Sequence, residues 1–178
     1  MSNQLIEKQI IYDGRRIRLE IHHLEDERGK RIQKEVCVHP GAVVILPFLD
    51  GDTILLIRNR RYTIGQYLIE LPAGGLEKNE DPMNAAGREC AEETGYVAGR
   101  LKRLKDFYSS PGILSEKMYT FAAYDLERAA QDLEDDEEIE VLPTAFDEAI
   151  QMIRDGRIMD GKPIATLLAY DRFERVTQ

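Results

Sequence analysis

The chain has 178 residues, and its 33 acidic and 24 basic side chains give a formal net charge of −9 at pH 7. This length fits one domain, or a core with a small accessory element, and an apolar fraction of 43% is enough for a packed core. The acidic balance argues against a nucleic-acid-binding protein, because phosphate attraction needs a basic face. No apolar run is long enough to span a membrane, and the two cysteines show neither disulfide nor metal-ligand spacing. We therefore expect a cytoplasmic protein without membrane partners.

The first forty residues predict a small antiparallel β unit. Residues 17–22 alternate apolar and polar side chains, the period of a half-buried strand. Asp13-Gly14 before them is a turn signal, and residues 32–38 read as a strand that returns after a polar turn. We therefore expect an N-terminal antiparallel β unit over residues 1–40 and a main domain over residues 41–178.

The main domain reads as several strands with a few helices. Residues 42–49 and 53–57 are apolar strands joined by Asp50-Gly51-Asp52, which predicts a hairpin. Further strands are expected at 67–71, 101–107 and 118–124, and helices at 82–94, 145–154 and 163–173. Because many strands follow one another through short connections, the fold class is α/β of the mixed, α+β kind rather than a doubly wound parallel sheet.

The helix at 82–94 has recognisable ends. Asp81 is a suitable N-cap, Pro82 suits the first helical position, and Gly95 is a left-handed stop. One stripe of this helix is expected to pack on a sheet; it comprises Met83, Ala86, Cys90 and Thr94.

The opposite stripe of the same helix carries Glu89, Glu92 and Glu93 within roughly a 100° arc. Arg88 is the one basic residue close by, and its position predicts that it points away from this stripe. Three neighbouring carboxylates repel one another when solvated, yet they offer the oxygen ligands that Mg²⁺ prefers. A solvated acidic helix face is the alternative, and the helix alone does not decide between the two.

The spacing around the helix narrows the choice. Gly74 is followed after five residues by Glu80, and after seven more by Arg88-Glu89, Glu92-Glu93 and Gly95. This pattern matches the box G-x5-E-x7-R-E-U-x-E-E-x-G-U, with Cys90 and Tyr96 at the two bulky apolar positions. The chain therefore resembles a Nudix hydrolase.

The resemblance implies a Nudix fold, with a mixed sheet sandwiched by helices, and a site for Mg²⁺, which Mn²⁺ can replace. It also implies that Glu80 pairs with Arg88 and braces the loop before the helix. Metal ligands are expected from Glu89, Glu93 and the backbone carbonyl of Ala73. Glu92 is expected to be an auxiliary carboxylate, and Arg88 and Glu92 are counted with the catalytic residues.

Features outside the box are similar to ADP-ribose pyrophosphatases and other nucleoside diphosphate sugar hydrolases. Pro111 lies 16 residues after Gly95 in a Ser-Pro-Gly setting typical of that subfamily. The resemblance implies hydrolysis of ADP-ribose to AMP and ribose 5-phosphate by a homodimer. Two alternatives remain: an enzyme for GDP-mannose or several such sugars, and a non-catalytic Nudix domain that senses a nucleotide.

The resemblance also suggests residues beyond the box. Seven of the nine residues from Asp132 to Glu140 are acidic, and the subfamily places there a loop Glu that acts as base or additional metal ligand. Alignment on Ile139-Glu140-Val141 gives Glu137, with Asp135 and Glu138 as alternatives. The substrate contacts implied are Arg61 on a phosphate, Glu116 on the terminal ribose, Lys34 on the adenosine half from the partner-facing strand, and Glu70.

Overall fold

The computed structural model describes residues 3–133 and 137–175, and the chain divides into two compact units. The first unit comprises the residues up to Gly41 together with Tyr108–Lys117. The second unit comprises Ala42–Phe107 and the chain from Met118 onward. A segment from the middle of the chain therefore belongs with the N-terminal strands.

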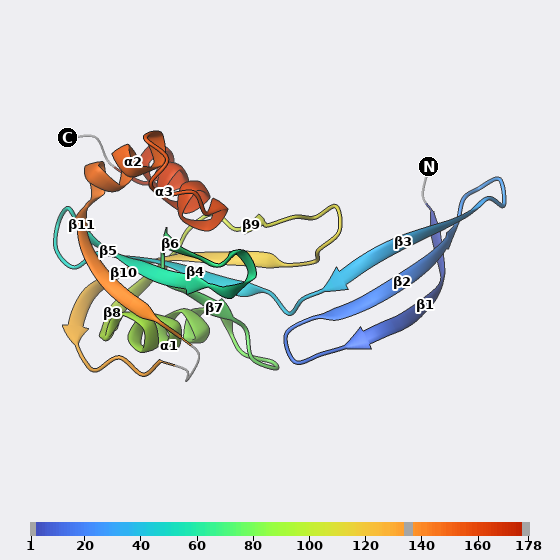
Figure 1. Cartoon of the computed structure of the whole chain (residues 1–178), viewed down its shortest axis with the longest axis horizontal. Helices are drawn as coiled ribbons and strands as arrows, with labels where there is room; N and C mark the ends of the chain where they lie inside the picture. Colours follow the sequence, from blue (N-terminus) through green and yellow to red (C-terminus); the bar gives the residue numbers. More distant parts are fainter. Residues whose placement is uncertain (1–2, 134–136, 176–178) are drawn as a thin grey trace. The chain divides into compact units, whose positions relative to one another are not determined.

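The first unit is an antiparallel sheet in the order β1-β2-β3 (Figure 1). Its strands are β1 (Gln4–Asp13), β2 (Arg18–Glu25) and β3 (Arg31–Val38). The inserted segment attaches to β3, where the amide of Cys37 donates to the carbonyl of Ile113 at 2.8 Å. The predicted antiparallel pairing of these strands is confirmed.

The second unit contains two sheets and three α-helices. The larger sheet has the order β7-β4-β10-β8, with β9 also paired to β10, and β4 and β10 run parallel. Its strands are β4 (Ala42–Pro47), β7 (Ala73–Gly75), β8 (Tyr96–Arg103), β9 (Phe107–Tyr108) and β10 (Lys117–Arg128). The smaller, antiparallel sheet has the order β11-β5-β6, from β5 (Thr53–Arg61), β6 (Gln66–Glu70) and β11 (Ile139–Ala145). The helices are α1 (Pro82–Thr94), α2 (Phe146–Arg154) and α3 (Gly161–Phe173).

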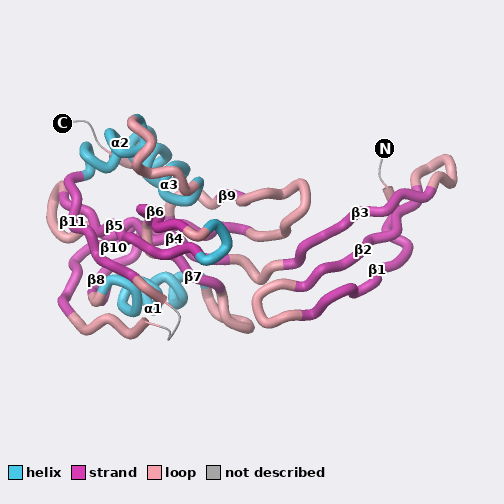
Figure 2. Tube along the Cα trace, in the orientation of Figure 1, coloured by secondary structure: helices cyan, strands magenta, loops and turns pink. Residues whose placement is uncertain are grey.

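Alternate residues of β4 form two hydrophobic layers. Val43 and Ile45 pack in a buried cluster with Cys90 of α1, whereas Val44 and Leu46 pack in another with residues of α2 and α3. Figures 1 and 2 show α1 on one side of the sheets and α2 and α3 on the other. The strand period of two thus places helices on both faces, and the expected mixed sheet sandwiched by helices is confirmed.

The predicted hairpin over Asp50-Gly51-Asp52 is wrong. The turn forms, since the amide of Leu49 donates to the carbonyl of Thr53 at 2.8 Å. The strands then separate into different sheets, and a single bridge joins Phe48 to Ile54. Both edges of β4 are already paired, with β7 and β10, and both strands are apolar on both faces, so each is buried in its own sheet.

Helix α1 begins and ends as expected. Asp81 accepts hydrogen bonds from the amides of Met83 and Asn84 at 2.9 and 3.4 Å, and Gly95 has φ 71°. The prediction that Met83 packs on the sheet is wrong, because its side chain is exposed in the first helical turn.

Two strand and helix starts were misplaced. β8 begins at Tyr96, directly after the helix, and not at Leu101 as predicted. No apolar run marks this start, because the side chains of β8 are partly or fully exposed. α3 begins at Gly161 and is capped by Asp160, two residues before the proline used to predict it. Among the described residues, no helix combines the length and apolar character needed to cross a bilayer.

Candidate active site

The loop before α1 is fixed to the helix by an ion pair. Arg88 donates from Nε and Nη2 to the two carboxylate oxygens of Glu80 at 3.0 and 3.1 Å. Glu80 also accepts from the amide of Glu77 at 2.9 Å, and Arg88 reaches the carbonyl of Gly75 at 3.4 Å. The expected Glu80–Arg88 pair therefore forms, and it holds the glycine-containing strand β7 beside the helix.

Arg88 also binds the acidic stripe, so the prediction that it points away is wrong. Its Nη1 donates to Glu89 Oε1 and Glu92 Oε2, each at 2.8 Å. The backbone position lies off the stripe, but the long side chain brings a planar group with several donors back to it. The hydrogen bond to Glu80, and after it the charge of Glu89, raise the pKa of Arg88 further above its ordinary value. One guanidinium thus orients three carboxylates.

Gly74 lies directly against the carboxylate of Glu89. A Cβ placed on Gly74 would lie 2.0 Å from the carboxylate carbon of Glu89 and 2.0 and 2.2 Å from its oxygens. At neighbouring Gly75 an added Cβ would meet nothing within 4 Å. A Cβ at position 74 would therefore displace the end of the Glu89 side chain, which explains the close approach that glycine permits here.

Glu93 is buried, with 3% of its surface exposed, and accepts a hydrogen bond from the amide of Ala73 at 2.9 Å. Burial raises its pKa to about 8, although the Ala73 bond acts in the opposite direction. Burial also raises the pKa of Glu89. The charges of Glu89 and Glu137 raise the pKa of Glu93 further, so these carboxylates lie close enough to repel one another.

This donor set fits a hard divalent cation. Within residues 3–133 and 137–175, no three His, Cys, Asp or Glu side chains are already gathered as a complete metal site. Glu89 is held by Arg88 and Glu93 by a backbone amide, which accounts for their separate orientations. Two carboxylates whose pKa values are raised by removal from water favour a nearby positive charge, and oxygen ligands of this kind suit Mg²⁺ or Mn²⁺.

Strand alternation distinguishes the candidate loop acids. Ile139 and Val141 lie on the face of β11 that is paired with Asn59 and Ile57 of β5, and the same alternation continued two residues earlier assigns Glu137 to this face. The charge of Glu137 raises the pKa of both Glu89 and Glu93, as expected for a group beside them. Glu138 lies on the other face and is bound there by Tyr67 at 2.6 Å. Asp135, the third candidate, lies outside the described residues.

Arg61 and Glu70, both predicted as substrate contacts, bind each other. Arg61 donates from Nε and Nη2 to the two oxygens of Glu70 at 2.7 and 2.5 Å, and Glu70 has no exposed surface. This bond raises the pKa of Arg61, and the charge of Arg61 lowers that of Glu93. The pair therefore lies near the metal-ligand candidates.

Lys162 is a charged residue of this region that the sequence did not indicate. Its Nζ lies 3.5 Å from Glu70 Oε2 and 2.6 Å from Asp160 Oδ2, the N-cap of α3. The predicted helix begins at Pro163, one residue after Lys162, so Lys162 lies outside the helices expected from the sequence. Asp160 before a glycine is the N-cap signal that could have located it.

Lys34 and Glu116 belong to the first unit, whereas the other predicted site residues belong to the second. Lys34 lies on β3 opposite His22, and Glu116 Oε1 lies 3.6 Å from His39 Nδ1. These contacts are within the first unit.

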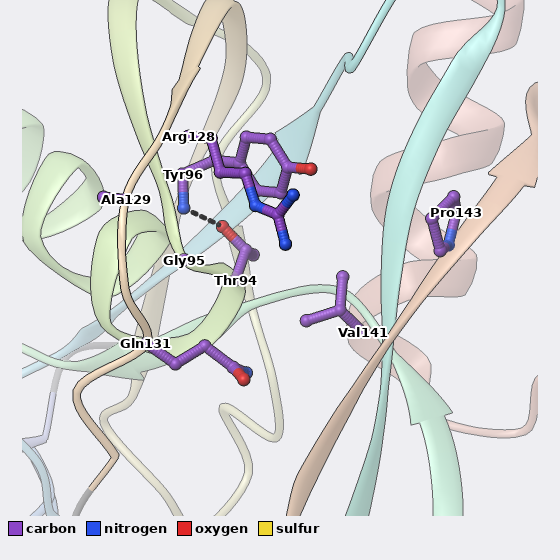
Figure 3. Close-up of a pocket in the computed structure, with 8 residues that line it drawn as sticks. All are labelled: Thr94, Gly95, Tyr96, Arg128, Ala129, Gln131, Val141 and Pro143. Atoms are coloured by element: carbon purple, nitrogen blue, oxygen red, sulfur yellow. Dashed lines mark hydrogen bonds between the residues drawn. The ribbon is translucent and has the colours of Figure 1, made fainter.

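A cavity of about 340 Å³ lies at the C-terminal end of α1. Figure 3 shows its lining, in which the amide of Tyr96 donates to Thr94 Oγ1 at 3.1 Å and the side chain of Arg128 extends past the tyrosine ring. Val141 and Pro143 of β11 face them from the other side. None of the predicted site residues lines this cavity, so we do not assign the site to it.

Comparisons with known proteins support the same family as the box. The model of the NUDIX domain matches residues 38–165. An ADP-ribose pyrophosphatase of Bacillus subtilis is 34% identical over 164 residues, which cover 91% of this chain and 89% of that protein. A GDP-mannose pyrophosphatase of Salmonella paratyphi B is 38% identical over 136 residues, 71% of each chain. The crystal structure of an ADP compounds hydrolase superposes with a TM-score of 0.85 at 23% identity, covering 97% of this chain and 94% of that one, and shows the same fold.

Proposed function

The chain belongs to the Nudix hydrolases, and from this premise we propose that it hydrolyses the pyrophosphate bond of a nucleoside diphosphate sugar, with ADP-ribose as the preferred substrate. The products would be AMP and ribose 5-phosphate. The observation that carries the proposal is a pair of carboxylates, the buried Glu93 and the partly buried Glu89, held beside the backbone of β7. The similarity to an ADP-ribose pyrophosphatase along 91% of the chain supports the choice of substrate.

Nudix hydrolases generally require a divalent metal, and we propose Mg²⁺, with Mn²⁺ as a substitute. Glu89, Glu93 and the carbonyl of Ala73 would hold it, with Glu137 as a further ligand. When bound, such a cation neutralises charge on the diphosphate and acidifies a coordinated water. Arg88 would keep Glu89 and Glu92 oriented, because it already binds both.

The second step of the proposal concerns the proton and the phosphate. Glu137 would accept the proton of the attacking water, since its carboxylate is close enough to influence Glu89 and Glu93. Arg61 would bind a substrate phosphate. A guanidinium has five N–H donors, and two of those of Arg61 are bound to Glu70, which leaves donors for the phosphate and fixes the direction of the side chain.

Glu116 and Lys34 are proposed as contacts to the terminal ribose and to the adenosine half. Both are on the first unit, which we propose forms a homodimer with a second copy of the chain. β1 supports this proposal because all of its side chains are exposed, including Leu5, Ile6 and Ile11. Apolar side chains grouped on one strand are typical of an interaction surface.

GDP-mannose is a second candidate substrate, because a GDP-mannose pyrophosphatase is 38% identical over 71% of the chain. A panel of nucleoside diphosphate sugars at equal concentration, assayed with Mg²⁺, Mn²⁺ and chelator, would compare the two. A preference of tenfold or more for GDP-mannose would replace ADP-ribose as the substrate. Thermal stabilisation by ADP-ribose with no turnover under any divalent ion would instead indicate a sensor domain.

The metal assignment is tested by Glu93→Gln, which removes the charge of a buried carboxylate and keeps its size. We expect AMP release with Mg²⁺ to fall at least a hundredfold, because a neutral amide is a poor ligand for a hard cation. Glu127→Gln, an exposed carboxylate of β10, is the matched control and should retain activity. Activity of Glu93→Gln within twofold of the wild type would contradict the assignment.

A further inference from the structure

A group of side chains lies on the face of the β11-β5-β6 sheet opposite the carboxylate site. Tyr67 Oη donates to Glu138 Oε2 at 2.6 Å, and Arg60 Nη1 lies 3.7 Å from Glu138 Oε1. The guanidinium of Arg58 lies 4.3 Å from the centre of the Tyr67 ring and also 3.4 Å from Glu140. We call Arg58, Arg60, Tyr67 and Glu138 the Tyr67 cluster.

The strand register explains why these residues meet. Arg60 of β5 is directly opposite Tyr67 of β6, and Asn59 is opposite Ile139 of β11. Glu138 precedes Ile139, so it reaches the same face as Arg60 and Tyr67. The cluster therefore joins β5 and β6 to the residue that precedes β11, at the point where the acidic run enters the sheet.

The contact of Glu138 with Tyr67 also affects the preceding residue, Glu137. Successive side chains of an extended chain point to opposite faces, so binding Glu138 on one face directs Glu137 to the other. That second face belongs to Ile139 and to the buried Asn59, and helix α1, which carries Glu89 and Glu93, packs against β5 and β11. The orientation of the loop acid is thus linked to a contact on the far side of the sheet.

We propose that Tyr67 is a positioning residue for the hydrolytic reaction: its hydroxyl binds Glu138 and thereby keeps Glu137 directed at the carboxylate site. The proposal rests on the proposed function, in which Glu137 accepts the proton of the attacking water. It assigns a role to an exposed tyrosine that touches neither substrate nor metal. It also selects Glu137 from a run of acids whose sequence does not fix the register.

The hydroxyl is the important element of the cluster. A hydrogen bond from a phenol to a carboxylate is charge-assisted and short, whereas the ion pairs of Glu138 with Arg60 and of Glu140 with Arg58 are exposed and contribute little. The bond raises the pKa of Tyr67, so the phenol remains a donor at neutral pH. Arg58 stacks on the ring and holds it in place.

The test is Tyr67→Phe, which removes one oxygen and keeps the ring. We expect kcat for the nucleoside diphosphate sugar to fall about five- to tenfold, because displacement of a proton acceptor by about 1 Å slows the reaction. KM should stay within twofold, since no substrate contact is lost, and the melting temperature should be unchanged for an exposed residue. Glu140→Ala, which removes an exposed ion pair from the same face of β11, is the matched control and should keep the wild-type kcat.

A double variant separates positioning from a general structural effect. In Glu137→Gln the loop acid no longer accepts a proton, so adding Tyr67→Phe should cause no further loss of kcat. Glu138→Gln keeps an oxygen that accepts the phenol bond and should retain activity, whereas Glu138→Ala should behave like Tyr67→Phe. A kcat of Tyr67→Phe within twofold of the wild type, or losses that multiply with those of Glu137→Gln, would overturn the proposal.

Failure of the proposed function would be recognised separately. If the wild type hydrolysed none of the substrates with any divalent ion, the proposed hydrolytic function would be wrong. Hydrogen exchange would then test the contact between Tyr67 and Glu138 without an activity assay. Faster exchange at the amides of residues 138–140 in Tyr67→Phe than in the wild type would support anchoring of the loop end. Identical exchange in the two proteins would overturn it.

Discussion

The side chain of Glu89 occupies space that any residue other than glycine at position 74 would need. The distance of 2.0 Å from a Cβ on Gly74 to this carboxylate is far below any real contact, so one of the two groups would have to move. Glu89 is the more flexible of the two, but it is also bound by Arg88. The geometry of one metal-ligand candidate on α1 therefore depends on the absence of a side chain on strand β7.

We predict that Gly74→Ala displaces Glu89 and lowers the affinity for Mg²⁺ by about tenfold or more, in line with losses at residues that orient metal ligands. Gly75→Ala is the matched control, because its Cβ meets nothing within 4 Å. Isothermal titration of both variants with Mg²⁺ or Mn²⁺ would measure the difference. Equal affinities in the two variants would contradict this account of Gly74.

Burial of Glu93 predicts how the stability of the metal-free protein depends on pH. Its pKa is about 8 in the folded chain against an ordinary value of 4.5, so between these values the folded state binds more protons than the unfolded state. The free energy of unfolding therefore decreases as pH rises through this window. The carboxylates with lowered pKa values titrate below about 4.5 and do not oppose this trend.

We expect the melting temperature, measured with chelator present, to be several degrees lower at pH 8.5 than at pH 5.5. Glu93→Gln should flatten this dependence, because the amide does not titrate, and saturating Mg²⁺ should flatten it for the wild type by favouring the charged carboxylate. Melting curves at six pH values would measure both effects. A wild-type melting temperature that rises over this range would contradict the prediction.

Helix α1 shows how local signals and a long-range contact combine in one element. Its ends are set by residues adjacent in sequence, Asp81 at the N-terminus and Gly95 at the C-terminus. The orientation of its acidic stripe depends on Arg88, which also binds Glu80 in the preceding loop. The local signals fix where the helix lies along the chain, and the ion pairs fix how its carboxylates are presented.

We predict that Asp81→Ala lowers the free energy of unfolding by about 1 kcal/mol, the usual effect of losing an N-cap, through loss of the bonds to the amides of Met83 and Asn84. Asp81→Asn is the control, because an asparagine oxygen accepts the same bonds. Urea denaturation would measure the difference. If the two variants were equally destabilised, the effect would come from charge and the cap would not be its cause.

The side chains of β1 are exposed in the first unit, so in a single chain its apolar residues contribute no burial energy. Burial of apolar side chains against a second copy would stabilise this unit, since burial contributes roughly 25 cal/mol per Å². Exposed apolar residues are present elsewhere, such as Val97 on β8, but β1 concentrates several of them on one strand. The proposed homodimer is therefore assigned to this strand.

We predict that Ile6→Glu combined with Ile11→Glu converts a dimer to a monomer, because both side chains are about half exposed in one chain and would be charged within the interface. Val97→Glu, at a similarly exposed position of the second unit, should leave the dimer intact. Light scattering at micromolar concentration would report the mass. A wild-type protein that is already monomeric would contradict the dimer.

Several features of the fold and site could be predicted because they depend on neighbours along the chain. The caps of α1, the antiparallel pairing of β2 with β3 and the spacing of the box are of this kind. The apolar face predicted for β2 is wrong, because Glu20 is its buried residue and Ile17 is exposed. The direction of Arg88 was predicted wrongly, since a long side chain need not follow its Cα. The hairpin after β4 was predicted wrongly because β4 is already paired on both sides, by strands distant in sequence.

The amino-acid sequence was sufficient for the family and for the carboxylates of α1, because a helix places residues 89, 92 and 93 on one stripe whatever surrounds it. The rest depends on groups brought together from distant parts of the chain. The burial that raises the pKa of Glu93, the bond from Arg61 to Glu70 and the opposite faces of Glu137 and Glu138 come from packing and sheet register. A run of similar acids does not indicate which residue faces which side of the sheet. The pairing of β11 with β5 and the contact of Glu138 with Tyr67 determine this.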